Sequence, residues 1–294
     1  MVDNVSRQEY FAKLNEDFCL TLKTSRGQAN PTFHIHDEYE LLLCLSDNMI
    51  CRVNGRQYEV GRDTLLLFNS MDLHQFGPQQ SDAENRRYVL YYKPGYLESM
   101  FTSRVDLYAC FLFRPFPDCC VLPLSAEQSR EMQEQFEKIL ALEKAPEEEC
   151  YGKDFHIHLL LSELLLIVNR IYRSYHNIPG NSFPGNYQQI YKIIRYIHDN
   201  YSEGISLDGL AKDFYINKYS LCKVFREVTG YTPSQYLINW RIAKAKQFLL
   251  NGCSVDQACA ESGFNNLSHF SRTFKRVVGL SPKQFQQKGK RENF

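Results

Sequence analysis

Short runs of β-branched and aromatic residues, separated by turn residues, fill the first third of the chain. Between residues 32 and 92 these runs cover residues 39–45, 49–53, 56–60, 64–69 and 87–92. The pair Asn54-Gly55, between the second and third runs, is typical of a two-residue hairpin turn because both residues tolerate positive φ. Closely spaced short strands of this kind predict a small antiparallel β-sandwich or barrel.

After Pro123 the apolar residues recur at spacings of three and four, which is typical of helices. Residues 125–145 begin with Ser125 and Gln128, the pair that forms a capping box. Residues 154–175 predict a second helix with apolar positions on more than one face, so it needs two packing partners. Either these are the β domain and a second copy of the protein, with Leu161 and Leu165 at the interface, or the helix is buried within its own chain.

Residues 176–186, with the sequence HNIPGNSFPGN, combine Pro, Gly, Asn and Ser without periodicity and predict a linker. Charge divides at the same point. Residues 187–294 contain 16 Lys+Arg against 8 Asp+Glu, whereas the rest of the chain contains 18 against 26. The formal net charge of zero is therefore +8 in one part and −8 in the other, which indicates that nucleic acid meets only the C-terminal part.

One plan occurs twice beyond the linker, with about fifty residues between the copies. In each copy a serine precedes a short helix, a turn follows, and an asparagine opens a second helix; these asparagines are Asn217 in the first copy and Asn265 or Asn266 in the second. A helix over residues 233–250 joins the two copies. Two helix-turn-helix units on a helical spacer can hold their second helices about 34 Å apart, one turn of B-DNA.

The chain has no run of 18 apolar residues, and residues 1–17 are mixed in charge without an apolar core, so neither membrane insertion nor secretion is expected. A cytoplasmic location follows. The ten cysteines include no Cys-x-x-Cys pair and are expected to be small buried apolar residues in a reducing compartment.

The C-terminal motifs resemble those of the AraC family of transcription activators over roughly residues 187–285. The resemblance is carried by GFNNLSHFSRTFKRVVGLSPKQF from Gly263 to Phe285, and by REVTGYTPSQYL and RIAKAKQFL. It departs at Ala258-Cys259 and at Tyr215, which occupies a turn position often filled by glycine. The resemblance and the outward faces of the two second helices imply these DNA-binding residues: Lys218, Tyr219, Ser220, Cys222, Lys223, Arg226, Leu267, Ser268, His269, Arg272, Lys275 and Arg276.

Four polar residues of the β region resemble the metal-ligand pattern of the cupin fold. His34, His36 and Glu40 stand at alternating positions, and His74 follows beyond the next turns. Three interpretations stay open for these side chains: a divalent metal such as Zn, Fe, Mn or Ni, polar contacts to an effector, or structural hydrogen bonds. The expected effector-binding residues are His34, His36, Glu40, Tyr39, His74 and Tyr88, and the metal ligands would be His34, His36, Glu40 and His74.

These patterns predict an α+β protein with an N-terminal cupin-like β-barrel or sandwich, a helical dimerisation segment and a C-terminal all-α domain with two helix-turn-helix motifs. The expected boundaries are 1–120 for the effector-binding domain, 121–175 for the dimerisation segment, 176–186 for the linker and 187–294 for the DNA-binding domain. No cofactor is assigned beyond the divalent metal, and no catalytic residue is assigned.

The resemblance implies a ligand-responsive, sequence-specific regulator that activates an operon of carbohydrate use and is not an enzyme. Its expected partners are an operator in double-stranded DNA, a small-molecule effector such as a saccharide, RNA polymerase and a second copy of the chain, with no membrane. A second hypothesis is a metal-dependent cupin enzyme that carries a DNA-binding domain.

Overall fold

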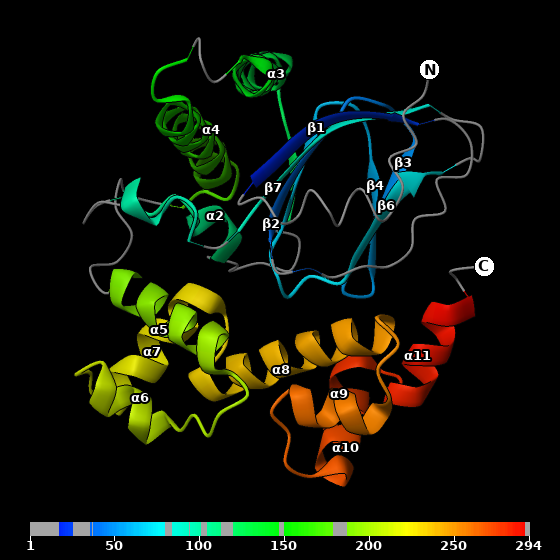
Figure 1. Ribbon diagram of the computed structural model, residues 1–294, viewed down its shortest axis with the longest axis vertical. Coiled ribbons are helices and arrows are strands. Elements are labelled where there is room, and N and C mark those ends of the chain that lie inside the picture. Colours follow the sequence, from blue (N-terminus) through cyan, green and yellow to red (C-terminus); the bar gives the residue numbers. More distant parts are fainter. Residues whose placement is uncertain are drawn as a thin grey trace.

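Two layers make up the molecule (Figure 1). In the figure the strands and helices α2 to α4 form the upper layer, and helices α5 to α11 form the lower one. The computed structural model describes residues 18–25, 36, 38–79, 84–93, 95–100, 105–112, 120–146, 150–178 and 187–291. His34 and residues 179–186 of the expected linker lie outside these ranges. The predicted combination of a β domain with a helical C-terminal domain is confirmed.

In the described part of the β domain, the strands form two antiparallel sheets. The larger has the strand order β1-β7-β2-β5-β8, and the smaller has the order β4-β3-β6. The five predicted runs are confirmed as β2, β3, β4, β5 and β7, whereas β1, β6 and β8 were not predicted. The bounds of the strands are Phe18–Ser25 (β1), Tyr39–Cys44 (β2), Met49–Val53 (β3), Arg56–Val60 (β4), Thr64–Phe68 (β5), His74–Pro78 (β6), Asn85–Tyr92 (β7) and Val121–Pro123 (β8).

The predicted hairpin turn between β3 and β4 is also confirmed. Asn54 and Gly55 have φ angles of 49° and 85°, the two positive values that a type I′ turn requires. The turn sets the register of the smaller sheet, in which Val53 faces Arg56. Asn54 also binds Asp72 through its side chain, at 2.9 Å from Nδ2 to Oδ1, and so links this turn to the segment before β6.

Strand β2 is buried on both faces, and its side chains alternate between two cores. Leu42 and Cys44 lie in the core between the two sheets. Tyr39, Leu41 and Leu43 lie in a larger core that the sheet shares with helices of both domains. Neighbouring residues of one strand therefore belong to different parts of the molecule.

Helices cover the outer face of the larger sheet. They are the short helices η1 (Glu98–Met100) and α2 (Ala109–Leu112) and the longer helices α3 (Ala126–Lys144) and α4 (Lys153–Tyr175). Ser125 and Gln128 form the predicted capping box at the start of α3. In α4, Asn169 accepts a hydrogen bond from the backbone N–H of Cys110 at 3.0 Å, which ties this helix to α2.

Helix α4 is long and apolar enough to cross a membrane by length and composition, with a mean hydropathy of 1.3 over its most apolar 18 residues. The expectation of no such segment was therefore too strong. Half of that window is buried inside the protein, because α4 packs against α3, α2 and the shared core. Internal packing of this kind is typical of the core helices of globular proteins.

The predicted placement of Leu161 and Leu165 at a dimer interface is wrong. Both side chains are buried within their own chain, at 1% and 0% exposure. The apolar side chains that α4 exposes lie on a different face and include Phe155, Leu159 and Leu166. One face of α4 therefore packs in the core, and another face is exposed to solvent.

Within the described residues 187–291, seven helices form the C-terminal domain. Their bounds are Tyr187–Asn200 (α5), Leu207–Asp213 (α6), Lys218–Thr229 (α7), Pro233–Leu250 (α8), Val255–Glu261 (α9), Leu267–Val278 (α10) and Pro282–Arg291 (α11). Side chains cap the helices as the sequence predicts: Ser206 caps α6 and Ser254 caps α9. Asn217 caps α7, and Asn266 rather than Asn265 caps α10.

Helix α8 runs below the β domain and joins the two helix-turn-helix units (Figure 1). The two layers touch at two places, one on α5 and one on α8. Tyr108 of the upper layer and Tyr191 of α5 have ring centroids 6.0 Å apart. Leu73, just before β6, packs against the apolar cluster that contains Ile242 and Leu249 of α8.

All nine cysteines in the described part of the chain are free thiols. Burial raises the pKa of Cys44 to about 11, and it also raises the pKa of Cys51. Because the thiolate is the reactive form, these two residues act as small apolar side chains of the inner core.

Leu165→Ala is expected to lower the free energy of unfolding by about 2–5 kcal/mol, because it opens a cavity in the shared core. Leu166→Ala on the exposed face is the matched control, with an expected change within about 0.5 kcal/mol. Urea denaturation of the full chain, followed by circular dichroism, measures both. Equal losses for the two variants would contradict the assignment of the faces.

Candidate functional site

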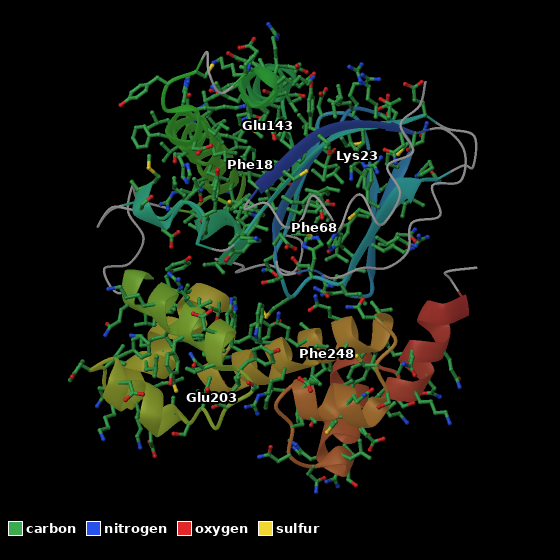
Figure 2. All side chains as sticks on the ribbon, in the orientation of Figure 1. Phe18, Lys23, Phe68, Glu143, Glu203 and Phe248 are labelled. Carbon is green, nitrogen blue, oxygen red and sulfur yellow. The ribbon has the colours of Figure 1, made fainter. Side chains whose placement is uncertain are left out.

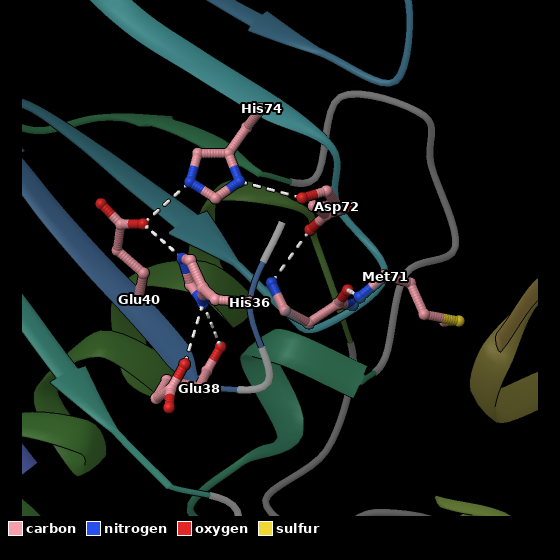
Figure 3. Close-up of polar contacts among 7 residues, drawn as sticks. His36, Glu38, Glu40, Met71, Asp72 and His74 are labelled. Atoms are coloured by element: carbon pink, nitrogen blue, oxygen red, sulfur yellow. Dashed lines mark hydrogen bonds and ion pairs between the residues drawn. The ribbon is translucent and has the colours of Figure 1, made fainter. Parts of the chain in front are cut away.

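Three polar side chains meet inside the β domain (Figure 3). Glu40 comes from β2, His74 begins β6, and His36 precedes β2. Oε2 of Glu40 lies 3.0 Å from Nε2 of His36 and 2.9 Å from Nε2 of His74. One ligand atom from each residue falls within 4.8 Å of the other two. We refer to His36, Glu40 and His74 as the polar triad.

Backbone carbonyls orient both imidazole rings. Nδ1 of His36 lies 3.1 Å from the carbonyl oxygen of Glu38, and Nδ1 of His74 lies 2.9 Å from that of Asp72. A carbonyl only accepts, so each Nδ1 carries the proton and donates it. In a neutral ring the lone pair then sits on Nε2 and points at the carboxylate. The triad is therefore complete only when protons or a cation occupy the space between these atoms.

Burial makes this requirement strict. Glu40 is 2% exposed and His74 is 0% exposed, so water does not screen the three groups. Burial opposes ionisation of Glu40, but His74 and His36 outweigh it and hold the pKa of this carboxyl well below its usual range. Burial likewise lowers the pKa of His36, yet Glu40 and Glu38 overcome this effect and raise it. The carboxylate stays charged and demands positive charge beside it.

The donor set fits a divalent transition metal. Two imidazoles and one carboxylate form a known facial ligand set, and the metal-binding histidines of proteins usually donate their second N–H to a backbone carbonyl. Ligand atoms at right angles and about 2.1 Å from a metal lie about 3.0 Å apart, which agrees with the 3.0 Å and 2.9 Å separations here. Of the four predicted ligands, the structure brings these three together, and His34 lies outside the described residues.

Two predicted effector residues lie elsewhere. Tyr39 and Tyr88 face the helical side of the larger sheet, opposite to Glu40, because side chains alternate along a strand. Tyr39 packs against Tyr108 with ring centroids 5.0 Å apart, and the hydroxyl of Tyr88 donates to Glu137 of α3. The expectation that they share a site with the histidines is wrong.

Two aromatic rings lie against the histidines of the triad, and one of them, Phe68, was not predicted from the sequence. The ring of Phe68 stacks on His74 with centroids 4.0 Å apart, and the ring of Tyr91 meets His36 edge-on at 5.2 Å. Both side chains lie on the same face of the larger sheet as Glu40, because both residues pair directly with it. Phe68 does so from β5, and Tyr91 does so from β7. Strand register would have identified Phe68.

Asp72 is a further residue that the sequence analysis did not assign. Its carboxylate accepts hydrogen bonds from the backbone N–H of Asn69 and from the side chain of Asn54, while its carbonyl oxygen orients His74. Met71, next to it, extends away from the triad (Figure 3) and packs against the core shared with the C-terminal domain. The segment from Asn69 to Leu73 therefore connects the triad with the contact between the layers.

A second candidate site is the outer surface of helices α7 and α10. Of the twelve predicted DNA-binding residues, the structure leaves ten exposed and two half-buried, Ser220 and Cys222. The inner faces carry Phe225 in α7 and Phe270 and Phe274 in α10, all at 0% exposure. Each unit thus presents a polar surface on a buried aromatic base.

Cations dominate this surface. Lys218 forms an ion pair with Asp208 of its own unit. Within the described part of the chain, no acidic side chain pairs with Lys223, Arg272 or Arg276. Exposed cations without an acidic partner are available to phosphate and to base edges in the major groove.

Two protein-family models match the chain. One, described as an AraC-like ligand binding domain, matches residues 17–165, and another, described as a helix-turn-helix domain, matches residues 210–288. Among solved structures, the fold is similar to that of ToxT from Vibrio cholerae with a bound unsaturated fatty acid. That comparison has a TM-score of 0.51 and 14% identity, and it covers 92% of this chain and 94% of ToxT.

Curated relatives match along most of their length. The transcriptional activator RhaS of Yersinia pestis is 26% identical over 255 residues, which covers 86% of this chain and 88% of RhaS. The uncharacterised transcriptional regulator YdeC of Bacillus subtilis is 23% identical over 258 residues, which covers 86% of this chain and 85% of YdeC. Both domains of the chain are therefore covered by proteins described as transcriptional regulators.

Arg272→Ala is expected to weaken binding to the preferred DNA site by about 1–3 kcal/mol and to relax the preference at one base pair, as the loss of a bidentate guanine contact would. Arg276→Ala, one helical turn further along α10, should instead weaken all sequences alike. Fluorescence anisotropy with the preferred and with random duplexes measures both. Equal losses on the two duplexes for Arg272→Ala would refute base reading by this residue.

Proposed function

The chain belongs to the AraC family of transcription regulators, and from this premise we propose how its two sites divide the work of a ligand-responsive DNA-binding regulator. In this proposal the polar triad senses the effector, and helices α7 and α10 bind DNA in a sequence-specific way. The observation that carries the proposal is the repeated exposed cationic face on α7 and α10, which lies in the same chain as a buried carboxylate that needs positive charge beside it. The match over residues 17–165 covers the sensing part.

Helices α7 and α10 each enter a major groove in this proposal. Asparagine caps leave the first turn of each helix open to solvent, where Tyr219 and Leu267 are 78% and 42% exposed. Apolar groups at such positions suit the methyl group of thymine, and Arg272 and Lys223 suit guanine and phosphate. The remaining contacts come from the other predicted DNA-binding residues on the same faces.

The polar triad holds a divalent cation in this proposal, and the donor separations and the carbonyl oxygens that orient both imidazole rings support it. His36, Glu40 and His74 would hold the metal. A metal there would neutralise Glu40 and offer a coordination position to an oxygen of the effector. The side chains themselves orient the site, because their backbone partners fix both rings before any ligand arrives.

Two routes lead from the triad toward the DNA-binding domain. The first runs from His74 to Asp72 and on to Leu73, which packs on α8. The second runs through Tyr39, the neighbour of Glu40, to Tyr108 and then to Tyr191 of α5. Occupancy of the triad can bias the pose of α5 and α8 through these contacts, which is how a sensor site and a reading site share free energy.

We assign an activator that acts on a metabolic operon, since RhaS is described as an activator. Such an activator contacts RNA polymerase, and it works in the cytoplasm, where the operator is. A saccharide remains our effector class on the family resemblance alone, because Tyr39 and Tyr88, the two tyrosines expected to bind the effector, face the helical side of the larger sheet. A thermal-shift screen of sugars and small acids against the full chain tests this class.

A metal-dependent enzyme with a DNA-binding domain is the competing function. The whole-length relatives are transcriptional regulators, which favours regulation. Turnover assays on the metal-loaded protein, with sugars and small acids as substrates, distinguish the two. Catalytic turnover that Glu40→Gln abolishes would support the enzyme.

Zn²⁺ is expected to bind the full chain at about one ion per molecule and to raise its melting temperature, since a ligand of the folded state stabilises by mass action. Glu40→Gln and His74→Ala should abolish this binding. Glu59→Gln is the matched control, because its exposed carboxylate on β4 lies outside the triad and should leave Zn²⁺ binding intact. Isothermal titration calorimetry and differential scanning fluorimetry measure these effects.

Both triad variants should retain the DNA affinity of the metal-free protein, since the triad lies outside the reading surface. Metal binding that persists in Glu40→Gln would contradict the assignment of the ligands. Loss of DNA binding by folded His74→Ala would contradict the division of roles between the two sites.

We further propose that α4 docks a second copy of the chain through its exposed face. Tyr151 before the helix, together with Phe155, Leu159 and Leu166, forms an apolar stripe on the surface. These positions recur at spacings of four and seven, so they share one side of the helix. A homodimer would place two double-headed domains on one operator and raise affinity through effective concentration.

Leu159→Glu combined with Leu166→Glu is expected to convert a dimer into a monomer, because the interface would have to desolvate two charges. His156→Glu adds a charge at an exposed polar position of the same helix and should leave the dimer intact. Light scattering at tens of micromolar protein measures the mass. A wild-type protein that remains monomeric at this concentration would contradict the dimer.

A further inference from the structure

Arg241 lies where the two helix-turn-helix units approach each other. It stands in the middle of α8, the helix that joins them. Its Nε donates to the carbonyl oxygen of Tyr201 at 2.7 Å, and one terminal nitrogen donates to that of Glu203 at 2.7 Å. Both carbonyls belong to the loop between α5 and α6, on which Glu203 is labelled in Figure 2. One guanidinium thus binds two backbone oxygens of the first unit.

The same guanidinium touches the second unit. Its central carbon lies 5.9 Å from the ring centroid of Phe264, in the turn between α9 and α10. Partial burial lowers the pKa of Arg241, the direction expected for a cation withdrawn from water. Lys244, one turn along α8, lies 5.6 Å from the ring of Tyr201 and supports the same loop. Three chain segments therefore meet at one side chain.

At Gly263, beside Phe264, the backbones of the two units approach each other directly. A Cβ atom there would lie 2.8 Å from Cα of Ser202 and 2.8 Å from the carbonyl oxygen of Tyr201. Both are backbone atoms of the loop in the first unit, so they cannot swing away as a side chain would. The turn of the second unit and the loop of the first are packed against each other without room for a methyl group.

The repeat offers an internal comparison. Tyr215 and Gly263 each stand nine residues after the serine that caps the first helix of their unit. Both have positive φ, 51° for Tyr215 and 79° for Gly263. Tyr215 is 96% exposed, so this turn accepts a large side chain where nothing packs on it. What demands glycine at residue 263 is therefore the contact between the units, in addition to the backbone angle.

We propose that Arg241, with Gly263, locks the two units into one rigid body. The lock sets the distance that the protein accepts between two DNA boxes, the short segments that α7 and α10 contact. This inference rests on the proposed DNA reading by α7 and α10. Arg241 acts as a positioning residue, since its donors are used by the loop. Aromatic contacts such as that of Phe225 with Tyr236 hold the first unit on α8, and the guanidinium adds the contact that fixes the α5–α6 loop against the turn of the second unit.

The spacing between boxes is the readout that tests the lock. Selection from a random duplex library with the full wild-type chain yields the preferred two-box site. Affinity is then measured on that site and on versions with one or two base pairs inserted or deleted between the boxes. Each inserted pair moves one box by about 3.4 Å and rotates it by about 35° relative to the other.

Wild type should bind one spacing and lose at least about tenfold in affinity for each added or deleted base pair, because a rigid pair of helices cannot follow the groove. Arg241→Ala should bind its best spacing more weakly, yet lose less than about threefold when the spacing changes. Arg241→Lys keeps the charge and the aliphatic stem but lacks the two N–H donors that bind both carbonyls at once. It should tolerate a change of spacing as Arg241→Ala does. Arg195→Ala, which alters an exposed arginine of α5, should match wild type.

Folded Arg241 variants that discriminate spacing as sharply as wild type would overturn the lock, as would a uniform loss at all spacings. If Arg241→Ala does not fold, the Arg241→Lys panel decides alone. Failure of wild type to select any two-box site would instead refute the proposed DNA reading, which keeps the two failures distinct.

Discussion

The buried carboxylate of Glu40 is the group on which the arrangement of the β domain depends. It holds two imidazoles from different segments, and each imidazole is bound at its other nitrogen to the backbone of its own segment. An ionised carboxylate at this depth is stable only with compensating positive charge. The proton or cation between His36, Glu40 and His74 therefore holds several segments in place. These are the start of β6, His36 before β2, and the segment from Asn69 to Leu73 that reaches α8.

Sequence periodicity predicts much of this domain but not which residues share the site. The runs that became β2 to β5 and β7 were visible because β-branched and aromatic residues cluster between turn signals, and Asn54-Gly55 marked a hairpin. Tyr39 and Glu40 show the limit: as neighbours on a strand buried on both faces, they lack the polar and apolar alternation that would assign the faces. Tyr39 therefore joined the predicted site although it lies in the other core, and Phe68 was missed because its proximity to Glu40 follows from register between distant strands. The same ambiguity affected α4, where Leu161 and Leu166 are equally apolar and only the fold distinguishes the covered side from the exposed one.

The C-terminal domain was more predictable because its signals are local. Caps, turns and inner aromatic residues lie within a few positions of one another, and the exposed faces of α7 and α10 follow from helical periodicity. The contact of Arg241 with the α5–α6 loop joins residues about forty positions apart, and no local pattern announces it. A sequence shows that Gly263 occupies a turn, whereas the structure shows that the neighbouring unit leaves its side chain no room.

In the proposed function, the polar triad and the DNA-reading surface share free energy through the contact between the layers. Thermodynamic reciprocity tests it most directly: the Zn²⁺ affinity of the full chain is measured with and without saturating two-box DNA, and the DNA affinity with and without Zn²⁺. Both affinities are expected to change by the same factor, between about 5 and 150. A Zn²⁺ affinity that is unchanged by saturating DNA would contradict it.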